Sequence, residues 1–385
     1  MKTALPRDRR RLTPVSAAAH GPAQDGKAET TVIFGSDNMA GIAAPVLDAI
    51  VRASGGGATS YGDDHWSEQA QRELARVFET PVEAFFVATG TAANCLALSS
   101  LLNPWECVIA HHQGHIATDE STAPELFTGG ARVVGIGHGT GRMTPHDLVT
   151  ALARLPNHPP HNARPAVLSL AQANENGLVY TPDELAELCG IAHAANMRVH
   201  LDGARFANAV AALGCSPADL TWRAGVDVLC LGATKGGALA AEAVIFFGDA
   251  HDGAFAHRRK RTGHLVSKGR LFGAQFCGWL GDGAWLDLSR HANAMAKTLS
   301  DGLARVPGVK IAWPTDANEV FAMLPRTLCD RLHEAGASFS EWGTGALPDD
   351  TPLPADARYV RFVASFATTR ADVDALLAVC APAYA

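Results

Sequence analysis

The sequence predicts an α/β fold, in which a mostly parallel sheet is flanked by helices and is followed by a smaller C-terminal α+β domain. From Val32 onward, short apolar runs rich in Val, Leu and Phe alternate with longer segments of helical pattern, as in a sheet built from βαβ units. After about residue 282, this alternation gives way to a long helical stretch and several short strand-like pieces. We therefore expect a large domain over residues 31–282 and a small domain over residues 283–385.

One βαβ unit is specified in detail by residues 165–205. Its helix is expected to begin after the capping residue Thr181, with Pro182 in the first turn and Glu184 in the capping-box position. Asn196 stands where a left-handed residue would end the helix. The expected strands of the large domain share an apolar character and cover residues 84–88, 107–110, 132–136, 167–170, 199–201, 228–231 and 244–247.

Composition argues against several classes of partner. The chain has 385 residues, of which 47% are hydrophobic, and a formal net charge of −7, so it has no general attraction to nucleic acids or to anionic membranes. No run of about 18 apolar residues is present to span a membrane. The eight cysteines form no C-x-x-C pair and are expected to be free thiols in the cytoplasm. Residues 1–30 are expected to be a disordered extension, with an organelle transit peptide as the alternative.

Polar segments that contain glycine or charged residues follow five of the expected strands. In open α/β sheets the ligand binds outside the carboxyl ends of the strands. These segments are therefore expected to meet at one cleft, which would contain histidine, aspartate, arginine and lysine together. They read TGTAAN (89–94), HHQGH (111–115), AQANEN (171–176), DGAR (202–205) and GATKGG (232–237).

Lys235 ends an apolar run and is surrounded by small residues in GATKGGALAAE. An ammonium group is costly to desolvate, so a lysine at the mouth of a core strand is rarely placed there for packing. Burial and nearby cations can keep its amine neutral, which suits a nucleophile that forms a Schiff base. The small neighbours would leave space for a bulky planar group, and the alternative is an ordinary surface or salt-bridged lysine.

Three other positions suit the chemistry of a pyridoxal phosphate site. Asp202 could keep a pyridine nitrogen protonated so that the ring acts as an electron sink, and Arg205 could reach the ring oxygen. An ion pair between Asp202 and Arg205 is the alternative interpretation. Gly90 begins a helix whose free N–H groups could bind a phosphate.

A pair of histidines and a separate run of basic residues each allow more than one interpretation. His111 and His115 are four residues apart, but H-E-x-x-H spacing and a cysteine pair are absent, so we expect no metal ion. An imidazole stacked on a cofactor ring fits better. The basic run at residues 258–270 is expected to be a solvated helix face, with a cluster that faces a phosphate as the functional alternative.

Taken together, GATK, LDGAR, TGTAAN, the His115 segment, FGSDNMAG and SYGDD resemble the L-threonine aldolases. These are aspartate-aminotransferase-like, fold-type-I pyridoxal phosphate enzymes, and within them the chain looks most similar to phenylserine aldolases. The resemblance runs from about Phe34 to Thr369. It implies an aldehyde-lyase that cleaves L-3-hydroxy-α-amino acids such as L-threonine, L-allo-threonine and L-3-phenylserine to glycine and an aldehyde. A homotetramer built from dimers is implied by the resemblance alone.

The resemblance also assigns roles to individual residues. Lys235 would carry pyridoxal 5'-phosphate as a Schiff base, Asp202 would bind the ring nitrogen, and His115 would stack on the ring. Arg205 would bind the ring hydroxyl, and Ser36 and Arg361 would hold the substrate carboxylate. Further residues would contact the phosphate and the edge of the cofactor, some of them from a neighbouring subunit. They are Gly90, Thr91, Tyr61, Lys260, Arg261 and Arg270.

One departure from the family pattern affects the chemistry of the β-hydroxyl. Many low-specificity threonine aldolases carry a histidine before the N-G pair in the loop where this chain reads AQANENG. Glu175, His115 and Glu120 are therefore the candidates for holding and deprotonating that hydroxyl. A threonine transaldolase, or another lyase of the same fold, is the alternative function, and a cofactor-binding protein without catalysis is a more distant one.

Overall fold

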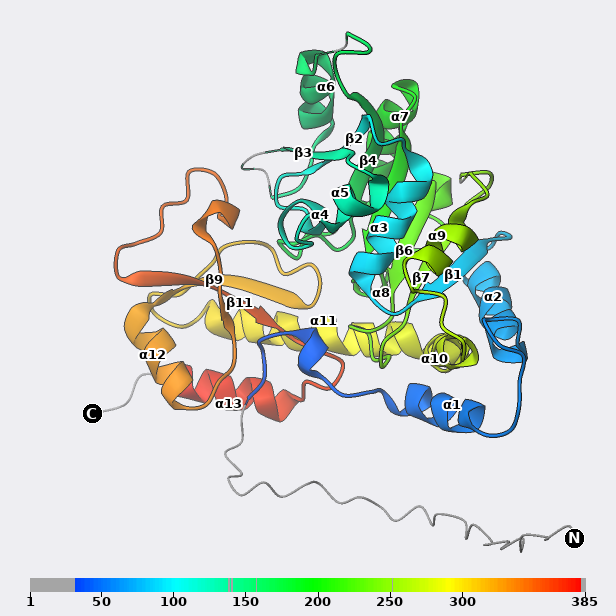
Figure 1. Ribbon diagram of the computed structural model, residues 1–385. Coiled ribbons are helices and arrows are strands. Elements are labelled where there is room, and N and C mark those ends of the chain that lie inside the picture. The colour runs from blue at the N-terminus through cyan, green and yellow to red at the C-terminus, as the bar shows by residue number, and fades with distance from the viewer. Residues whose placement is uncertain (1–31, 138, 140, 157, 251, 382–385) are drawn as a thin grey trace, which may run out of the picture.

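The computed structural model describes residues 32–381 except for residues 138, 140, 157 and 251. The predicted N-terminal extension therefore lies outside the described residues. Among the described residues, the chain forms two sheets, one of seven strands and one of four. Figure 1 shows that the second sheet and its helices, drawn in orange and red, lie beside the larger unit. None of the described helices is both long enough and apolar enough to cross a membrane.

The larger unit has the architecture that the alternating pattern predicts. Its strands are β1 (Glu83–Val87), β2 (Glu106–His111), β3 (Arg132–Ile136), β4 (Arg164–Ala171), β5 (Arg198–Gly203), β6 (Val228–Gly232) and β7 (Glu242–Phe246). Its helices are α1 (Ala44–Ser54), α2 (His65–Val77), α3 (Gly90–Leu101), α4 (His115–Thr118), α5 (Ala123–Thr128), α6 (Pro145–Arg154), α7 (Pro182–Ala194), α8 (Phe206–Leu213), α9 (Phe255–Arg261) and α10 (Arg270–Leu280). Every strand expected from the sequence is present.

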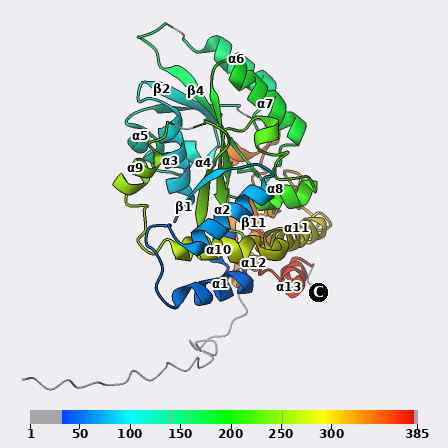
Figure 2. The same cartoon turned by 90° about the vertical axis from the view of Figure 1, so that its right-hand side faces the viewer.

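The seven strands follow the order β1-β7-β6-β5-β4-β2-β3. Only β7 runs against the others, because it pairs antiparallel with both β1 and β6. The remaining pairs are parallel, and parallel sheets require helical crossovers that bury both faces. Figure 2 shows α6 and α7 on one face of the sheet and α3, α5 and α9 on the other.

Helix α7 forms for the reasons given by its sequence. The Thr181 hydroxyl accepts the Glu184 backbone N–H, and the Glu184 carboxylate accepts the Thr181 N–H, which completes the capping box. Asn196 has a φ of 58°, so the chain leaves the helix through the left-handed region as predicted. The helix buries Leu185 and Leu188 against the sheet.

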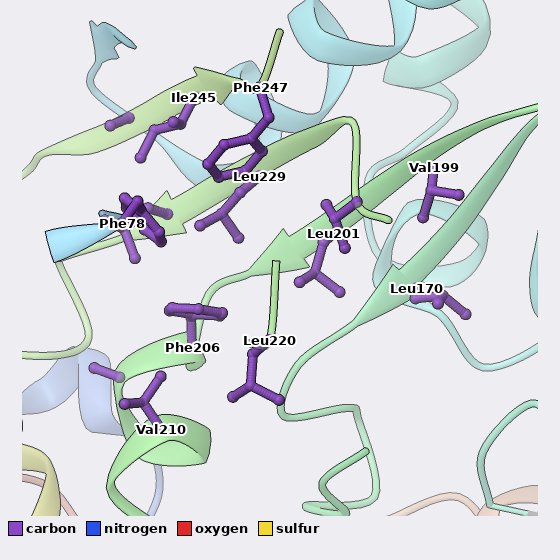
Figure 3. Packing of buried hydrophobic residues seen from close by; sticks show 14 of the residues in the cluster. Phe78, Leu170, Val199, Leu201, Phe206, Val210, Leu220, Leu229, Ile245 and Phe247 are labelled. Carbon is purple, nitrogen blue, oxygen red and sulfur yellow. The ribbon is translucent and has the colours of Figure 1, made fainter. Parts of the chain in front are cut away.

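An apolar core fixes the strands on the face that carries α2, α7, α8 and α10. Phe78 packs edge-on against Phe247 with 5.5 Å between ring centroids and lies 6.1 Å from Phe206. Figure 3 shows these rings beside Leu201 and Leu229, which project from neighbouring strands. Each fully buried side chain of this size contributes about 1.5–3 kcal/mol relative to exposure. The core therefore gives the strand ends a rigid base.

The second unit contains an antiparallel sheet and packs on a long helix. Its elements are α11 (Ala284–Leu303), β8 (Lys310–Ile311), β9 (Glu319–Pro325), α12 (Arg326–Glu334), β10 (Ser340–Glu341), β11 (Ala357–Val363) and α13 (Arg370–Cys380). Trp285 of α11 belongs to the core of the large unit, whereas Leu299 and Leu303 belong to the second core. Phe34 also packs in the second core, beside an isolated bridge between Ile33 and Ser338. Since α11 joins both cores, the division at residues 282–283 stays a prediction.

Candidate active site

The carboxyl ends of the strands meet at a cavity of about 350 Å³. The segments after β1, β2, β4, β5 and β6 all contribute to its wall, as the position of ligands in open α/β sheets requires. Eight of the residues singled out from the sequence line it, namely Gly90, Thr91, His115, Glu120, Glu175, Asp202, Arg205 and Lys235. An adjoining chamber of about 610 Å³ shares Lys235 and His115 with this cavity and is also lined by Ser36 and Arg361.

Lys235 lies in the loop between β6 and β7, and its side chain is half-buried. Within the part of the chain that the structure describes, its amine has no hydrogen-bond or ion-pair partner, although its charge acts on Asp37, Asp202 and Glu242. It is thus neither a structural ion pair nor a fully solvated surface lysine. The interpretation as a nucleophile gains support from this position.

The two glycines after Lys235 serve packing, which corrects, for these two positions, the expectation that the small residues around Lys235 leave space for a planar group. A Cβ on Gly236 would lie 3.0 Å from the Trp279 ring. Gly237 has a φ of +117°, and a Cβ there would lie 2.8 Å from Ala43. Only glycine adopts this backbone conformation without strain. These two glycines therefore let the lysine loop approach α10 and the residue before α1.

Asp202 lies one residue before the end of β5 and is almost fully buried, with 8% of its surface exposed. Its Oδ2 accepts a hydrogen bond from Asn94 Nδ2 at 2.7 Å, and its Oδ1 accepts the Ala204 backbone N–H at 2.9 Å. Burial alone would raise the pKa of Asp202, but the charge of His115 and the Ala204 hydrogen bond lower it below its ordinary value. Asp202 is therefore a buried carboxylate that faces the cavity in its ionised form.

His115 belongs to a hydrogen-bonded chain that connects it to Asp202. Its Nδ1 lies 2.9 Å from Glu120 Oε1, and that same oxygen accepts a hydrogen bond from Asn94 at 2.9 Å. The hydrogen bond to Glu120 raises the pKa of His115 above its ordinary value. Glu120 is buried, and its Oε1 fixes both the imidazole and the amide, while its Oε2 accepts a hydrogen bond from the Cys95 thiol at 3.6 Å. His115, Glu120 and Asp202 have ligand atoms within 4.8 Å of one another, and Asn94 accounts for this proximity without an ion.

Glu175 lies beside His115 at the loop after β4. Its Oε1 accepts the backbone N–H of His115 at 2.7 Å. Burial, together with the negative charge of Asp202, raises the pKa of Glu175 to about 7. A carboxyl group with this pKa can both give and take a proton near neutral pH.

Arg205 pairs with acidic residues from two distant segments rather than with Asp202. Its Nε lies 2.8 Å from Asp37 Oδ2, and its Nη2 lies 3.4 Å from Glu319 Oε1. The alternative of an Asp202–Arg205 ion pair is therefore wrong. Arg205 still lines the cavity, so its predicted contact with a ring hydroxyl stays a prediction.

Arg361 projects from β11 into the adjoining chamber. Its guanidinium stacks on the Trp342 ring at 4.0 Å from the centroid, and its Nη1 lies 3.5 Å from Glu319. Among the described residues, the buried Arg361 Nε has no hydrogen-bond partner. Ser36 lines the same chamber, and its hydroxyl accepts the Asn38 N–H at 3.1 Å. A carboxylate entering this chamber would meet an arginine with unused donors.

The start of α3 faces the cavity with free backbone N–H groups. The side chain of Thr89 caps the helix by accepting the Ala92 N–H at 3.1 Å. A Cβ added to Gly90 would meet no atom of the described residues within 4 Å, so the turn is open on its cavity side. Open N–H groups at a helix N-terminus suit a phosphate.

Four predicted residues do not line the cavity of their own chain. The ammonium of Lys260 lies 5.2 Å from the centroid of the exposed Tyr61 ring. Arg270 donates to the Gly56 carbonyl at 3.1 Å, and Arg261 ends the short helix α9. Contact of these residues with a cofactor stays a prediction and requires a second subunit.

Sequence reasoning missed residues that organise the site through distant pairs. Asn94 is the last letter of the TGTAAN segment, and Asp37 lies in FGSDNMAG, but their partners are 108 and 168 residues away. Glu319 and Glu242 are buried carboxyl groups at strand starts. An acidic residue at the start of an apolar strand was the sequence signal that could have identified both of them as buried carboxyl groups.

The site fits pyridoxal phosphate on structural grounds. One cavity is surrounded by a lysine whose amine has no partner among the described residues, a buried carboxylate, an imidazole and an open helix N-terminus. Each of these matches one part of that cofactor. The fold and the site together define a pyridoxal phosphate enzyme of fold type I.

Comparison with known proteins agrees with this class. Residues 34–326 match the beta-eliminating lyase family, and the chain belongs to that family. It is 42% identical over 307 residues to a low specificity L-threonine aldolase from Pseudomonas sp., an alignment that covers 80% of this chain and 88% of that protein. A low specificity L-threonine aldolase from Escherichia coli is 30% identical over 202 residues, which cover 51% of this chain and 57% of that protein.

Solved structures show the same fold. A threonine aldolase from Leishmania major superposes with a TM-score of 0.83 and 29% identity, covering 90% of this chain and 98% of that chain. A serine palmitoyltransferase from S. paucimobilis with bound PLP has a TM-score of 0.64 at 19% identity, over 91% of this chain and 86% of that chain, and shows the fold alone. The predicted fold type, cofactor and carbon–carbon lyase class are confirmed.

Proposed function

We propose that this protein is an aldolase that cleaves L-3-hydroxy-α-amino acids reversibly between Cα and Cβ, giving glycine and an aldehyde. The observation that carries the proposal is the position of Lys235, which lines both the cavity that contains the buried Asp202 carboxylate and the chamber that contains Arg361. Relatives described as low specificity L-threonine aldolases support the same reaction.

Each residue has a distinct task in this proposal. Pyridoxal phosphate, when bound through Lys235, supplies an electron sink for the bond that breaks at Cα. Asp202 would hold a proton on the ring nitrogen, His115 would contact the ring, and the Gly90–Thr91 turn would bind the phosphate. Arg361 and Ser36 bind the substrate carboxylate and so determine which bond at Cα is aligned for cleavage.

Glu175 is the best placed candidate to take the proton of the β-hydroxyl. Its pKa of about 7 matches the requirement for a general base near neutral pH. Glu120 is buried and already accepts hydrogen bonds from His115 and Asn94, so it acts by positioning His115. His115 itself remains the second candidate, because only its Nδ1 is used by Glu120.

The size of the chamber around Arg361 supports a broad substrate range. Its volume of about 610 Å³ and its wall of Trp342, His112 and Gln113 accommodate a methyl group or an aryl ring at Cβ. We therefore propose L-threonine, L-allo-threonine and L-3-phenylserine as substrates.

We further propose that the enzyme acts in the cytoplasm as a homotetramer assembled from dimers. Tyr61, Lys260, Arg261 and Arg270 lie outside the cavity of their own chain. In the dimer they would complete the cofactor site of the neighbouring subunit.

The decisive experiment compares the release of glycine and aldehyde from L-threonine and L-3-phenylserine by protein loaded with pyridoxal phosphate. Equal amounts of the two products from either substrate are expected, with faster cleavage of phenylserine if the chamber favours aryl groups. Loaded protein that cleaves neither substrate would exclude the aldolase. Exchange of the aldehyde without net release of glycine would assign a transaldolase instead.

A further inference from the structure

Glu242 is a buried carboxyl group that the proposed reaction does not use. It begins β7 and is paired in register with Val87 at the end of β1 and with Gly232 at the end of β6. After Val87 the chain continues to the Thr89–Gly90 turn, and after Gly232 it continues to Lys235. Glu242 thus lies between the phosphate turn and the lysine loop, and its side chain lines the same cavity.

The contacts of Glu242 tie it to the lysine loop. Its Oε1 accepts a hydrogen bond from the Thr234 hydroxyl at 2.6 Å, and that hydroxyl in turn accepts the Ala241 backbone N–H at 3.1 Å. Only 7% of the residue is exposed. The carboxyl group therefore cannot turn away from the cavity to be solvated.

The surroundings of Glu242 bring its pKa close to neutral pH. Burial raises its pKa to about 7, although the Thr234 hydrogen bond and the positive charge of Lys235 oppose this effect. The nearby ionisable groups are Lys235 on the lysine loop, Asp202 near the end of β5 and the Cys230 thiol of β6. The α3 turn contributes only the uncharged Thr89, Gly90 and Thr91. A phosphate at that turn would be the strongest new negative charge near Glu242.

We propose that Glu242 couples cofactor binding to pH: it is protonated when the cofactor phosphate occupies the α3 turn, and loss of its proton weakens cofactor binding. The inference rests on the proposed cofactor role of this site. Two negative charges in a buried cavity repel each other more strongly than they would in water, so a bound phosphate favours the neutral carboxyl group. By linkage, ionised Glu242 lowers the affinity for the phosphate by the same factor.

The test is the equilibrium dissociation constant of pyridoxal 5'-phosphate, measured by quenching of tryptophan fluorescence in the cofactor-free protein between pH 6 and pH 9. Glu242→Gln keeps a neutral side chain of the same shape at every pH. The ratio of the wild-type constant to the variant constant is expected to stay level at the acid end. It should then rise by up to about tenfold per pH unit above the pKa of Glu242, as one linked proton requires.

Two controls locate the effect. Pyridoxal, which lacks the phosphate, should give a ratio that does not change with pH. Glu106→Gln alters a buried carboxylate at the opposite end of the sheet, at the start of β2, and should show the wild-type pH profile. A ratio that rises equally for pyridoxal would mean that Glu242 acts on Lys235, and would overturn the coupling to phosphate.

A second variant tests the same coupling without removing the carboxyl group. Thr234→Val removes the hydroxyl that stabilises ionised Glu242, so the loss of affinity should move to higher pH. Two results would refute the inference while cofactor binding stands. One is a ratio of wild-type to Glu242→Gln dissociation constants that is constant across the pH range. The other is a loss of affinity that moves to lower pH in Thr234→Val. Failure of wild-type protein to bind pyridoxal 5'-phosphate at any pH would refute the proposed function as well.

Discussion

Replacing Asn94 by leucine is expected to destabilise the cofactor-free protein by about 3–6 kcal/mol. The Asn94 amide donates to Glu120 at 2.9 Å and to Asp202 at 2.7 Å, and all three residues are buried. A hydrogen bond to a charged group contributes about 1.5–3 kcal/mol, and leucine of similar shape would leave both carboxyl groups short of a donor. The free energy of unfolding is measured by urea denaturation at pH 7.

A double-mutant cycle separates the Asn94–Asp202 contact from the rest of this loss. Asn94→Leu, Asp202→Leu and the double variant should give a coupling energy of about 1.5–3 kcal/mol, because removing both partners avoids an unpaired buried group. The matched control is the cycle for Asn208 and Asn293, whose neutral side chains are hydrogen-bonded at 2.9 Å. Its coupling should be only about 0.5–1.5 kcal/mol. A value below about 0.5 kcal/mol for Asn94 and Asp202 would refute the proposed network.

Four other predictions test the site and the fold. Glu175→Gln should lower kcat by about 10²–10⁴-fold and abolish a rise of kcat through pH 7 in the wild type, where Glu175 loses its proton; an unchanged pH profile would exclude it as the base. Arg361→Ala should raise KM and lower kcat, whereas Arg358→Ala on the same strand, which pairs with Glu341 and Asp330, should leave both near wild type. Thr181→Ala should reduce the free energy of unfolding by about 1 kcal/mol in urea through loss of the cap, and no change in the midpoint would contradict the capping role. Burial raises the pKa values of Glu175 and Glu242 from 4.5 to about 7. The stability that these two groups confer is therefore complete below pH 4.5 and is lost as the pH rises through 7. The melting temperature of the cofactor-free Glu175→Gln, Glu242→Gln double variant should fall less over this pH range than that of the wild type.

The strands and the position of the site were predictable because their signals are local. Runs such as VLCLG are apolar, rich in branched residues and end in glycine or polar residues, and these features identify both the strand and the end at which a ligand binds. The capping box at Thr181 is similarly contained within four residues. Patterns of this length can be interpreted without knowledge of the rest of the chain.

The pairing of charged groups was not predictable for the opposite reason. Arg205 lies three residues from Asp202, which made that pair the natural alternative, yet its carboxylate partners Asp37 and Glu319 come from the start of the chain and from the second sheet. The glycines after Lys235 were likewise interpreted as space for a ligand, whereas Trp279 and Ala43 determine their size. Such contacts depend on how distant elements pack, and no local pattern encodes them.

The most direct test of the central claim identifies the residue that binds the cofactor covalently. Protein loaded with pyridoxal phosphate is treated with borohydride, digested and analysed by mass spectrometry, with Lys235→Ala as the control. The reduced cofactor should be found on Lys235 alone, and the variant should lack both the label and the visible absorption band. Label on another lysine, or a band that survives in Lys235→Ala, would contradict the assignment of this cavity as the active site.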